Sequence, residues 1–430
     1  MKLLRSLINQ NMRKVIPTRY FLVLGTFLLS LLLYIDRVCI SAAKNPISES
    51  LDFSDKQMGW ILSVFALGYA LFQTPSGMLA DRLGPRKILT TIVVLWSGFT
   101  ALTGAAWNYV SIIIVRFLFG ASEAGAFPGI SRAVFSWFPL KERGLVTGIN
   151  FSGSRLGAAF ALPAVAWLIH STGWRLSFLI LGIVGVVWAV FWYLWFRNTP
   201  EEHKRISVSE KEYILENRQQ VSKNVKAGIT LKTMLKSKNM VLAMWQYFCS
   251  NFTFFFTLTW LFPHLQSKYG LEIIEAGFYA SAPLIGGAIG NLFSGWLVDL
   301  IFKKGNWKMS RRFPAILGFT LVIIGLIGSL QMETVLGAIV FLTLAIFGAD
   351  MTLSPSWSFC VDIGKQNSGA VSGTMNMAGN IGSFLTALAF PYLQAWTGSE
   401  KPFFFVGAAF AFLAIISWGF MKPEKGIEEY

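Results

Sequence analysis

Charged side chains are scarce in this sequence. Asp, Glu, Lys and Arg make up only 14% of its 430 residues, whereas 54% are hydrophobic and the mean hydropathy is +0.54. Soluble domains hold about 25% charged residues, so the composition argues against an ordinary soluble enzyme or nucleic-acid-binding domain. It indicates instead a protein embedded in a lipid bilayer.

Cysteine and histidine are also rare, with three of each. Cys39, Cys249 and Cys360 fall inside apolar runs, so they indicate neither a disulfide framework nor a redox compartment. No Cys/His spacing is typical of a metal site, and no G-x-x-x-x-G-K-S/T loop or catalytic triad occurs. We therefore expect no metal, no cofactor and no enzymatic activity.

Twelve apolar runs are long enough to cross a membrane. A helix of about 18 or more apolar residues spans a hydrocarbon core roughly 30 Å thick. The first run is too long for the core of a cleavable signal peptide and carries Asp36 and Arg37, so we expect an uncleaved helix. The sequence predicts an all-α membrane protein with transmembrane helices at 20–42, 57–80, 88–107, 109–137, 144–170, 174–196, 239–266, 273–301, 312–331, 335–361, 367–395 and 402–421.

Basic residues outnumber acidic ones by 37 to 22, which gives a net charge of +15. In a soluble protein this excess would suggest nucleic acid as a partner. Here most Lys and Arg fall in the loops on the side of the two chain ends, and few fall in the opposite loops, among them Lys44, Arg175, Lys268 and Lys401. This positive-inside bias predicts two cytoplasmic termini and no nucleic-acid partner.

The only long polar segment of the sequence, 197–238, divides the chain into two parts with six expected helices each. These parts are the predicted N-terminal half, 1–196, and the predicted C-terminal half, 239–430, joined by a cytoplasmic linker. Within the linker, "SEKE" resembles a capping box with Ser209 as N-cap and Glu212 at the third helical position. We therefore expect a short amphipathic helix there.

The two halves also resemble each other at equivalent points. "GMLADRLGPRK" (77–87) follows the second helix and "GWLVDLIFKKG" (295–305) follows the eighth. "FGASEAGAFPG" in the fourth helix is echoed by "FGADMTLSPSW" in the tenth. Pseudo-symmetric halves with a site between them near the bilayer midplane are typical of secondary transporters.

One of these stretches is similar to a family signature. "GMLADRLGPRK" matches the loop motif of the major facilitator superfamily, G-x-x-x-D-R-x-G-x-R-R/K, at Gly77, Asp81, Arg82, Gly84, Arg86 and Lys87. The resemblance implies that Asp81, Arg82 and Arg86 form an inter-helix charge cluster that favours one gating state. A loop that only sets topology would explain the basic residues but neither the glycines nor the acid.

Three further stretches, "YIDRVCIS", "RFLFGASEAGAFPG" and "SPSWSFCVDIGKQNSGAVSGTMNMAGNIG", resemble the anion:cation symporter family. Its bacterial members include hexonate, hexuronate and glucarate carriers. The resemblance implies proton-coupled symport of an organic anion by alternating access, in a monomeric carrier of the bacterial inner (plasma) membrane. It also implies that Asp36 and Glu123 couple protons and that four side chains contact the ligand, namely Tyr34, Tyr69, Trp357 and Asn376.

The spacing of the intramembrane charges favours an anionic substrate. Arg116 and Glu123 lie seven residues, or about 10 Å, apart on one helix face, and Tyr34 and Arg37 share a face of the first helix. Arg37 and Arg116 facing the interior would grip a carboxylate. The proton occupancy of a buried acid responds to hydration and to nearby charge, although Asp36 and Glu123 also fit structural ion pairs.

Three roles are open for Arg155 in the fifth helix. It binds the second carboxylate of a diacid, pairs with Asp350 of the tenth helix in one gating state, or faces lipid or water. Other polar side chains on apolar helices are candidates for the pocket or for hydrogen bonds between helices, namely Ser154, Asn251, Ser354 and Ser356.

Other functions fit parts of this pattern. Aromatic carboxylates, tartrate or phosphate carried by sodium symport or exchange would also satisfy two arginines, and drug efflux or a non-transporting sensor are further alternatives. The arginines and acids favour anion uptake over efflux of lipophilic cations. The well-formed gating loop counts against a sensor.

Overall fold

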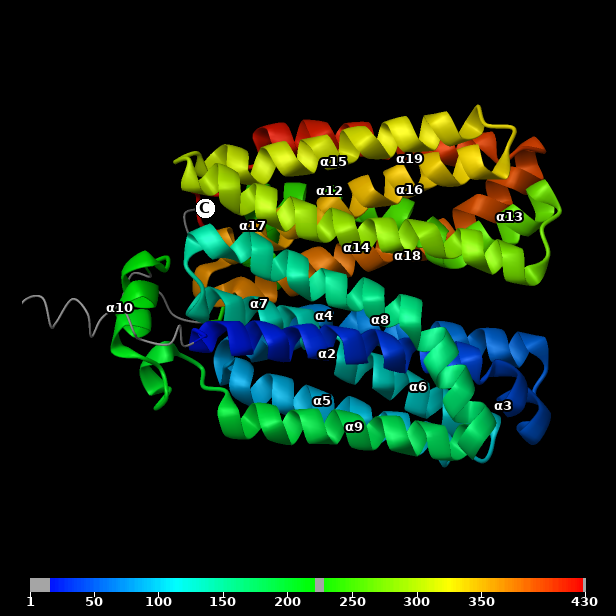
Figure 1. Ribbon diagram of the computed structural model, residues 1–430, viewed down its shortest axis with the longest axis horizontal. Helices are drawn as coiled ribbons and strands as arrows, with labels where there is room; N and C mark the ends of the chain where they lie inside the picture. The colour runs from blue at the N-terminus through cyan, green and yellow to red at the C-terminus, as the bar shows by residue number, and fades with distance from the viewer. Residues whose placement is uncertain (1–15, 221–227, 428–430) are drawn as a thin grey trace, which may run out of the picture.

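The computed structural model describes residues 16–220 and 228–427, apart from the side chains of residues 55–56, 162–163 and 273–274. The predicted cytoplasmic ends of the chain, 1–15 and 428–430, lie outside the described residues. The described residues are almost entirely helical and contain no strand. Figure 1 shows two bundles of long helices side by side, one blue to green and the other green to red.

The first bundle contains the six predicted helices of the N-terminal half. Two of its helices begin at capping boxes, Ser54 with Gln57 and Asn108 with Ser111, which satisfy the free N–H groups of the first turn. The helices are α2 (Thr18–Ala42), α4 (Asp55–Leu83), α5 (Pro85–Gly104), α6 (Tyr109–Glu123) with α7 (Ala126–Trp137), α8 (Arg143–Thr172) and α9 (Trp174–Trp195), with the short α3 (Lys44–Leu51) after α2.

The second bundle contains the remaining six, preceded by the short α11 (Leu231–Lys236). Its helices are α12 (Lys238–Thr259) with α13 (Leu261–Tyr269), α14 (Ile273–Lys303), α15 (Trp307–Leu330), α16 (Val335–Met351) with α17 (Leu353–Gly364), α18 (Ser368–Thr397) and α19 (Lys401–Phe420). The 3-10 turn at Lys365–Asn367 separates α17 from α18. The predicted fold class, twelve helices in two groups of six, is therefore confirmed.

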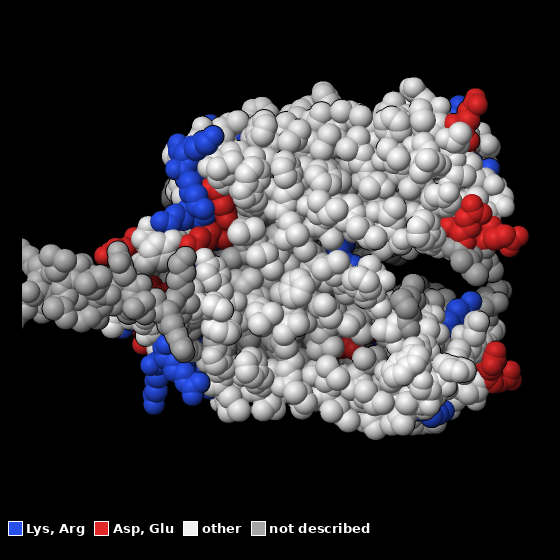
Figure 2. All heavy atoms as spheres, viewed as in Figure 1, with Lys and Arg blue, Asp and Glu red and all other residues white. Residues whose placement is uncertain are grey.

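The outer faces of these helices suit a bilayer. Nine helical stretches in the described part of the chain are long and apolar enough to span a membrane, or ten if the bent pair at 140–172 counts as one span. One of these stretches, 335–397, holds the tenth and eleventh predicted helices together. Charged side chains gather at the two ends of the molecule, and the belt between them is almost free of charge (Figure 2). The chain is a multi-pass membrane protein.

Three of the predicted helices are broken where the sequence had predicted continuous ones. The breaks separate α6 from α7, α12 from α13 and α16 from α17. A proline follows closely after each break, namely Pro128, Pro263 and Pro355. Proline has no N–H to bond to the carbonyl four residues earlier. Those carbonyls belong to the residues at or beside the breaks, Ala124, Thr259 and Met351.

The linker contains the predicted short helix, α10 (Val208–Asn217), but its predicted N-cap was wrong. Ser207, not Ser209, is the N-cap, and its hydroxyl accepts a hydrogen bond from the Glu210 backbone N–H. Glu210 also caps the first helix of the bundle, because its carboxylate accepts the backbone N–H groups of Thr18 and Arg19 at 2.8 and 3.0 Å. The linker helix is thus joined to the first helix of the bundle through Glu210.

The two bundles contact each other through glycine-containing helix pairs. The pairs are α4 with α18 and α8 with α14. A Cβ added at Gly77 would overlap the carbonyl oxygen of Gly369, and one added at Gly295 would lie 2.7 Å from that of Gly144. Small residues at these crossings let the backbones of the two halves approach closely.

We expect Gly77→Ala to destabilise the protein, because overpacking typically costs about 1–3 kcal/mol. Gly98→Ala is the matched control, since nothing lies within 4 Å of an added Cβ there. Thermal unfolding in detergent should show a lower midpoint for Gly77→Ala only. Equal midpoints for both variants and the wild type would contradict this close contact.

Candidate functional site

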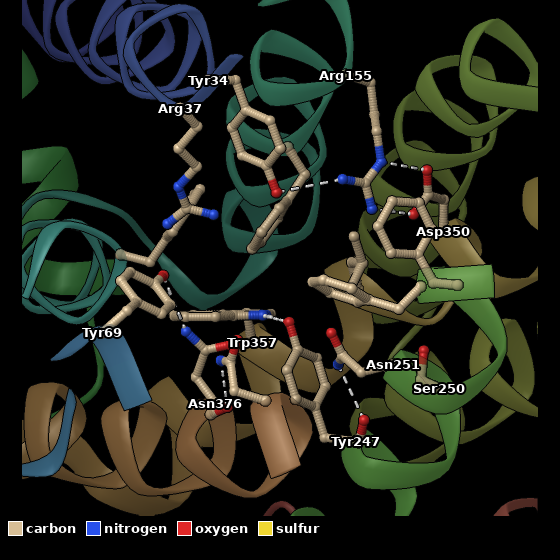
Figure 3. Close-up of a pocket in the computed structure, with 16 residues that line it drawn as sticks. Tyr34, Arg37, Tyr69, Arg155, Tyr247, Ser250, Asn251, Asp350, Trp357 and Asn376 are labelled. Atoms are coloured by element: carbon tan, nitrogen blue, oxygen red, sulfur yellow. Dashed lines mark hydrogen bonds and ion pairs between the residues drawn. The ribbon is translucent and has the colours of Figure 1, made fainter. Parts of the chain in front are cut away.

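A pocket lies between the two bundles and is lined by side chains of both (Figure 3). Its cavity volume is about 40 Å³. The walls come from α2, α4, α7 and α8 on one side and from α12, α16, α17 and α18 on the other. Predicted site residues among the lining are Tyr34, Arg37, Tyr69, Arg155, Trp357 and Asn376.

Arg37 is the cation that α2 brings to the pocket wall. Its Nε donates to Oε1 of Glu123 at 2.7 Å, and its guanidinium lies 4.4 Å from the ring centre of Tyr69 and 5.0 Å from that of Tyr34. Within the described residues, Nη2 of Arg37 has no hydrogen-bond partner. Arg37 therefore has donor capacity left over, while aromatic rings on two helices fix its position.

Asp36 and Arg116 lie outside the pocket lining, in the same charged cluster. Both are about 2% exposed or less, and Asp36 interacts electrostatically with Glu123 and Arg116. Arg116 packs its guanidinium 4.7 Å from the ring centre of Phe119. In the described part of the chain, the two carboxylate oxygens of Asp36 have no hydrogen-bond partner, and neither does the Nε of Arg116. Of the four predicted charges, Arg37 and Glu123 thus form an ion pair with Arg37 partly exposed, whereas Asp36 and Arg116 are both buried.

Arg155 forms an ion pair that joins the two bundles. Its Nε and Nη2 donate to the two carboxylate oxygens of Asp350 at 2.7 and 2.6 Å, and its Nη1 lies 3.4 Å from the Tyr34 hydroxyl. The ring centre of Phe254 is 3.7 Å from the guanidinium. The sequence left three roles open for Arg155, and in this conformation it pairs with Asp350. Both residues also line the pocket.

Polar and aromatic groups of the second bundle face these cations. The indole N–H of Trp357 donates to the Tyr247 hydroxyl at 2.9 Å, and the Asn376 amide donates to the Tyr69 hydroxyl at 3.4 Å. Asn251 lines the pocket and donates to the Tyr247 carbonyl. Sequence reasoning missed Tyr247, although its place one turn before Asn251 on the same helix face would have indicated it.

The predicted serines lie between helices rather than on the pocket wall. Ser356 donates to the Thr352 carbonyl at 2.6 Å and to the Gln246 side chain at 3.2 Å. Ser354 donates to the Gly144 carbonyl at 2.7 Å, and Ser154 is fully buried. None of the three lines the pocket in the described structure.

Two carboxylates close the end of the molecule that carries α10. Asp81 accepts the backbone N–H groups of Gly369 and Ala370, at the start of α18, at 2.8 and 2.7 Å. Asp299 accepts those of Gly144 and Leu145, at the start of α8, at 2.9 and 2.8 Å. Each carboxylate caps a helix of the other bundle, where the partial positive charge of the helix N-terminus favours an anion.

A third contact at the same end centres on Asp362 of α17. Its carboxylate pairs with Arg143 of α8 and Arg311 of α15, both at 2.8 Å, and all three side chains are fully buried. The linker reinforces this contact, because Gln219 accepts from Arg143 and donates to the Asp362 carbonyl. Figure 2 shows a slot between the bundles at the opposite end. The pocket is therefore shut on the α10 side.

The predicted gating loop contributes one residue, Asp81, to this closure. Arg132 approaches Asp81 at 3.8 Å. Arg86 instead contacts its own bundle, since its Nε donates to the Tyr193 carbonyl, and Arg82 is exposed. Gly84 has a φ of +80°, a conformation that favours glycine, at the turn from α4 to α5.

Comparison with known proteins gives consistent matches along the chain. Residues 26–387 match the sequence pattern of the Major Facilitator Superfamily. The chain is 31% identical to the "Probable sulfoacetate transporter SauU" of Cupriavidus necator, over 96% of both chains. It is 32% identical to the hexuronate transporter of Bacillus subtilis, over 94% of this chain and 95% of that one.

A solved structure supports the fold. The proton:xylose symporter XylE bound to 6-bromo-6-deoxy-D-glucose matches with a TM-score of 0.74 over 95% of this chain and 97% of that one. The two sequences are only 15% identical, so this likeness concerns the arrangement of the helices alone.

We expect Asp299→Asn to loosen the closed end as much as Asp81→Asn does. A carboxylate at a helix N-terminus stabilises by about 0.3–2 kcal/mol, so either change should shift the balance towards opening by roughly two- to thirtyfold. A cysteine introduced at the buried Ser368 should then react faster with an impermeant maleimide.

Asp52→Asn is the matched control for this measurement. Asp52 lies in the turn after α3 with a φ of 54°, which asparagine also tolerates. Protein without Ser368→Cys gives the background from the native cysteines, which are all buried. Labelling of Asp299→Asn at the rate of the control would show that this carboxylate does not hold the end closed.

Proposed function

Since the chain belongs to the Major Facilitator Superfamily, we propose that it takes up an organic anion together with protons by alternating access. The substrate class that we favour is a sugar acid, such as a hexonate, hexuronate or aldarate. One observation carries the proposal: the guanidinium of Arg37, held by Glu123, lies on the wall of a pocket between the two bundles. The chain is a transporter and not an enzyme.

The substrate carboxylate binds Arg37 in this proposal. A guanidinium offers two parallel N–H groups that match a carboxylate, which a neutral or cationic ligand would not use. The hydroxyl groups of the substrate bond to Tyr69, Asn251 and Asn376, and its carbon chain packs on Trp357. Similarity to a hexuronate carrier supports a sugar acid, and similarity to a sulfoacetate carrier favours a small sulfonate as the second candidate.

In this proposal the protons are carried by Glu123 and Asp36, the acids that lie beside the arginines. When the substrate anion binds Arg37, it competes with Glu123 for the same guanidinium, and a proton on Glu123 ends the competition. Asp36, which is buried in the same charged cluster without a hydrogen-bond partner in the described residues, is the second acid that takes up a proton in this proposal. A buried ionised carboxylate without a hydrogen-bond donor is strongly unfavourable, so release of an arginine and uptake of a proton belong to one event. A sodium-driven carrier or an exchanger is the alternative that the experiment below separates.

The orientation follows from the distribution of charge. Basic side chains of the predicted cytoplasmic loops gather at the α10 end, among them Arg82, Arg86 and Lys211, and this bias supports a cytoplasmic α10 end in a cell membrane. The described conformation would then open to the outside, ready to receive substrate. We further propose that a single chain is sufficient, since both walls of the pocket come from it, and that no nucleic acid is involved.

Glu123→Gln should separate exchange from accumulation. The amide mimics a permanently protonated acid, so loaded carriers should still exchange labelled for unlabelled substrate across proteoliposome membranes. Accumulation driven by a pH gradient should be lost, because that proton is no longer released inside. Full gradient-driven accumulation by the variant would remove Glu123 from the coupling role. If the wild type accumulates substrate in response to an imposed sodium gradient and not to a pH gradient, proton coupling itself would be contradicted.

Arg37→Lys should weaken binding of sugar acids by about tenfold or more, or about 1.4 kcal/mol. Lysine keeps the charge but loses the planar fork that grips a carboxylate. Ligand-dependent thermal stabilisation of the purified protein measures the change. Arg86→Lys is the control, because Arg86 contacts Tyr193 at the closed end and is not part of the pocket lining. The affinity of this variant for sugar acids should equal that of the wild type. Unchanged affinity in Arg37→Lys would refute the carboxylate contact.

A further inference from the structure

The pocket has a second cation whose role the proposed transport cycle does not use. Arg155 lines the same cavity as Arg37, and both contact Tyr34, whose ring faces Arg37 and whose hydroxyl lies 3.4 Å from Arg155. Figure 3 shows Tyr34 between the two guanidinium groups. One small ligand beside Tyr34 can therefore reach both cations.

The geometry at Arg155 is that of an occupied carboxylate site. Two N–H groups of the guanidinium bind the two oxygens of Asp350 at 2.7 and 2.6 Å, which is the bidentate arrangement that a ligand carboxylate would also adopt. Phe254 and Tyr34 hold the guanidinium independently of Asp350. Departure of the Asp350 carboxylate would thus leave the binding geometry of Arg155 in place.

The size of the cavity requires a rearrangement on binding. A volume of about 40 Å³ holds a few water molecules, whereas a six-carbon acid is much larger. The Arg155–Asp350 pair crosses from α8 to α16 and lines the cavity, so opening it enlarges the space where a ligand must fit. Asp350 is the penultimate residue of α16, directly before the break between α16 and α17, a place where the helix is able to adjust.

We propose that Arg155 is a second anion site and that the substrate carries two acidic groups. This inference rests on the proposed function, in which the first acidic group binds Arg37. The second group, a carboxylate or a sulfonate, replaces the carboxylate of Asp350 on Arg155. Asp350 then faces the hydrated cavity that it already lines. A substrate with one acidic group leaves the Arg155–Asp350 pair closed and gains only the contact with Arg37.

Two matched ligands test this inference on the purified full-length protein. Galactarate and galactonate share the configuration of their internal hydroxyl groups, but galactarate has a carboxylate at both ends, whereas galactonate has a carboxylate at one end and a hydroxyl group at the other. We expect the wild type to bind galactarate at least about tenfold more tightly. The double variant Arg155→Gln with Asp350→Asn replaces the ion pair by two neutral amides. It should bind both acids with affinities within about threefold of the wild-type affinity for galactonate.

A single variant covers the case in which the double variant does not fold. Asp350→Asn removes the competing carboxylate but keeps Arg155, so affinity for galactarate should rise by about threefold or more while affinity for galactonate stays unchanged. A wild type that binds galactonate as tightly as galactarate would overturn the inference. So would a double variant that keeps the preference for the diacid, or unchanged galactarate affinity in Asp350→Asn.

A third ligand separates failure of this inference from failure of the proposed function. Sulfoacetate has two acidic groups and no sugar hydroxyls. If the wild type binds sulfoacetate and neither sugar acid, the second anion site stands and the sugar-acid class is wrong. If it binds galactonate without preferring either ligand that has two acidic groups, the proposed function stands and the second site is wrong. Binding of none of the three refutes both.

Discussion

Charges inside a membrane are costly, and this cost shapes both the pocket and the contact between the two bundles. An isolated charge at the bilayer centre costs from about 3 to more than 10 kcal/mol, yet Arg116 of α6 and Arg155 of α8 are buried and Arg37 of α2 is only partly exposed. Arg37 holds Glu123 within one bundle, and Arg155 holds Asp350 across the two. Moving one carboxylate frees one arginine. In the proposed cycle this exchange links the ligand, the proton and the separation of the bundles.

In both bundles a buried acid lies at the end of a helix, directly before a break in that helix. Glu123 is the last residue of α6 and Asp350 the penultimate residue of α16, and in each bundle the fourth helix breaks directly afterwards. Pro128 and Pro355 account for both breaks through the hydrogen bond that each removes. The sequence echo "FGASE" and "FGADM" is thus a repeated structural element. At the closed end the repetition continues, because Asp81 and Asp299 each cap a helix of the other bundle.

Hydropathy predicted all twelve helices, because crossing a membrane requires long apolar runs whatever the tertiary contacts. It could not predict the breaks, since Pro75 and Pro314 lie inside unbroken helices and only packing decides which prolines interrupt the chain. Hydropathy also could not predict which residues far apart in sequence are in contact, such as Arg155 and Asp350, which are 195 residues apart. The sequence could offer that pairing only as one of three roles.

Helix periodicity also left the direction of small polar side chains open. Trp357 faces the pocket, whereas its neighbour Ser356 bonds to the Thr352 carbonyl one turn back. A serine satisfies itself in this way on either side of a helix, so its identity alone does not indicate a ligand contact. Large aromatic and charged residues were better guides, because burying them requires partners that also build the site.

Proton movement that accompanies substrate entry can be measured in proteoliposomes. Proteoliposomes containing the full chain and an internal pH indicator would receive galactarate, galactonate or the neutral polyol galactitol, without an imposed gradient. We expect that at least one of the acids acidifies the lumen and that galactitol leaves the internal pH unchanged. Uptake of labelled acid without any change of internal pH, or equal responses to the acid and the polyol, would contradict this expectation.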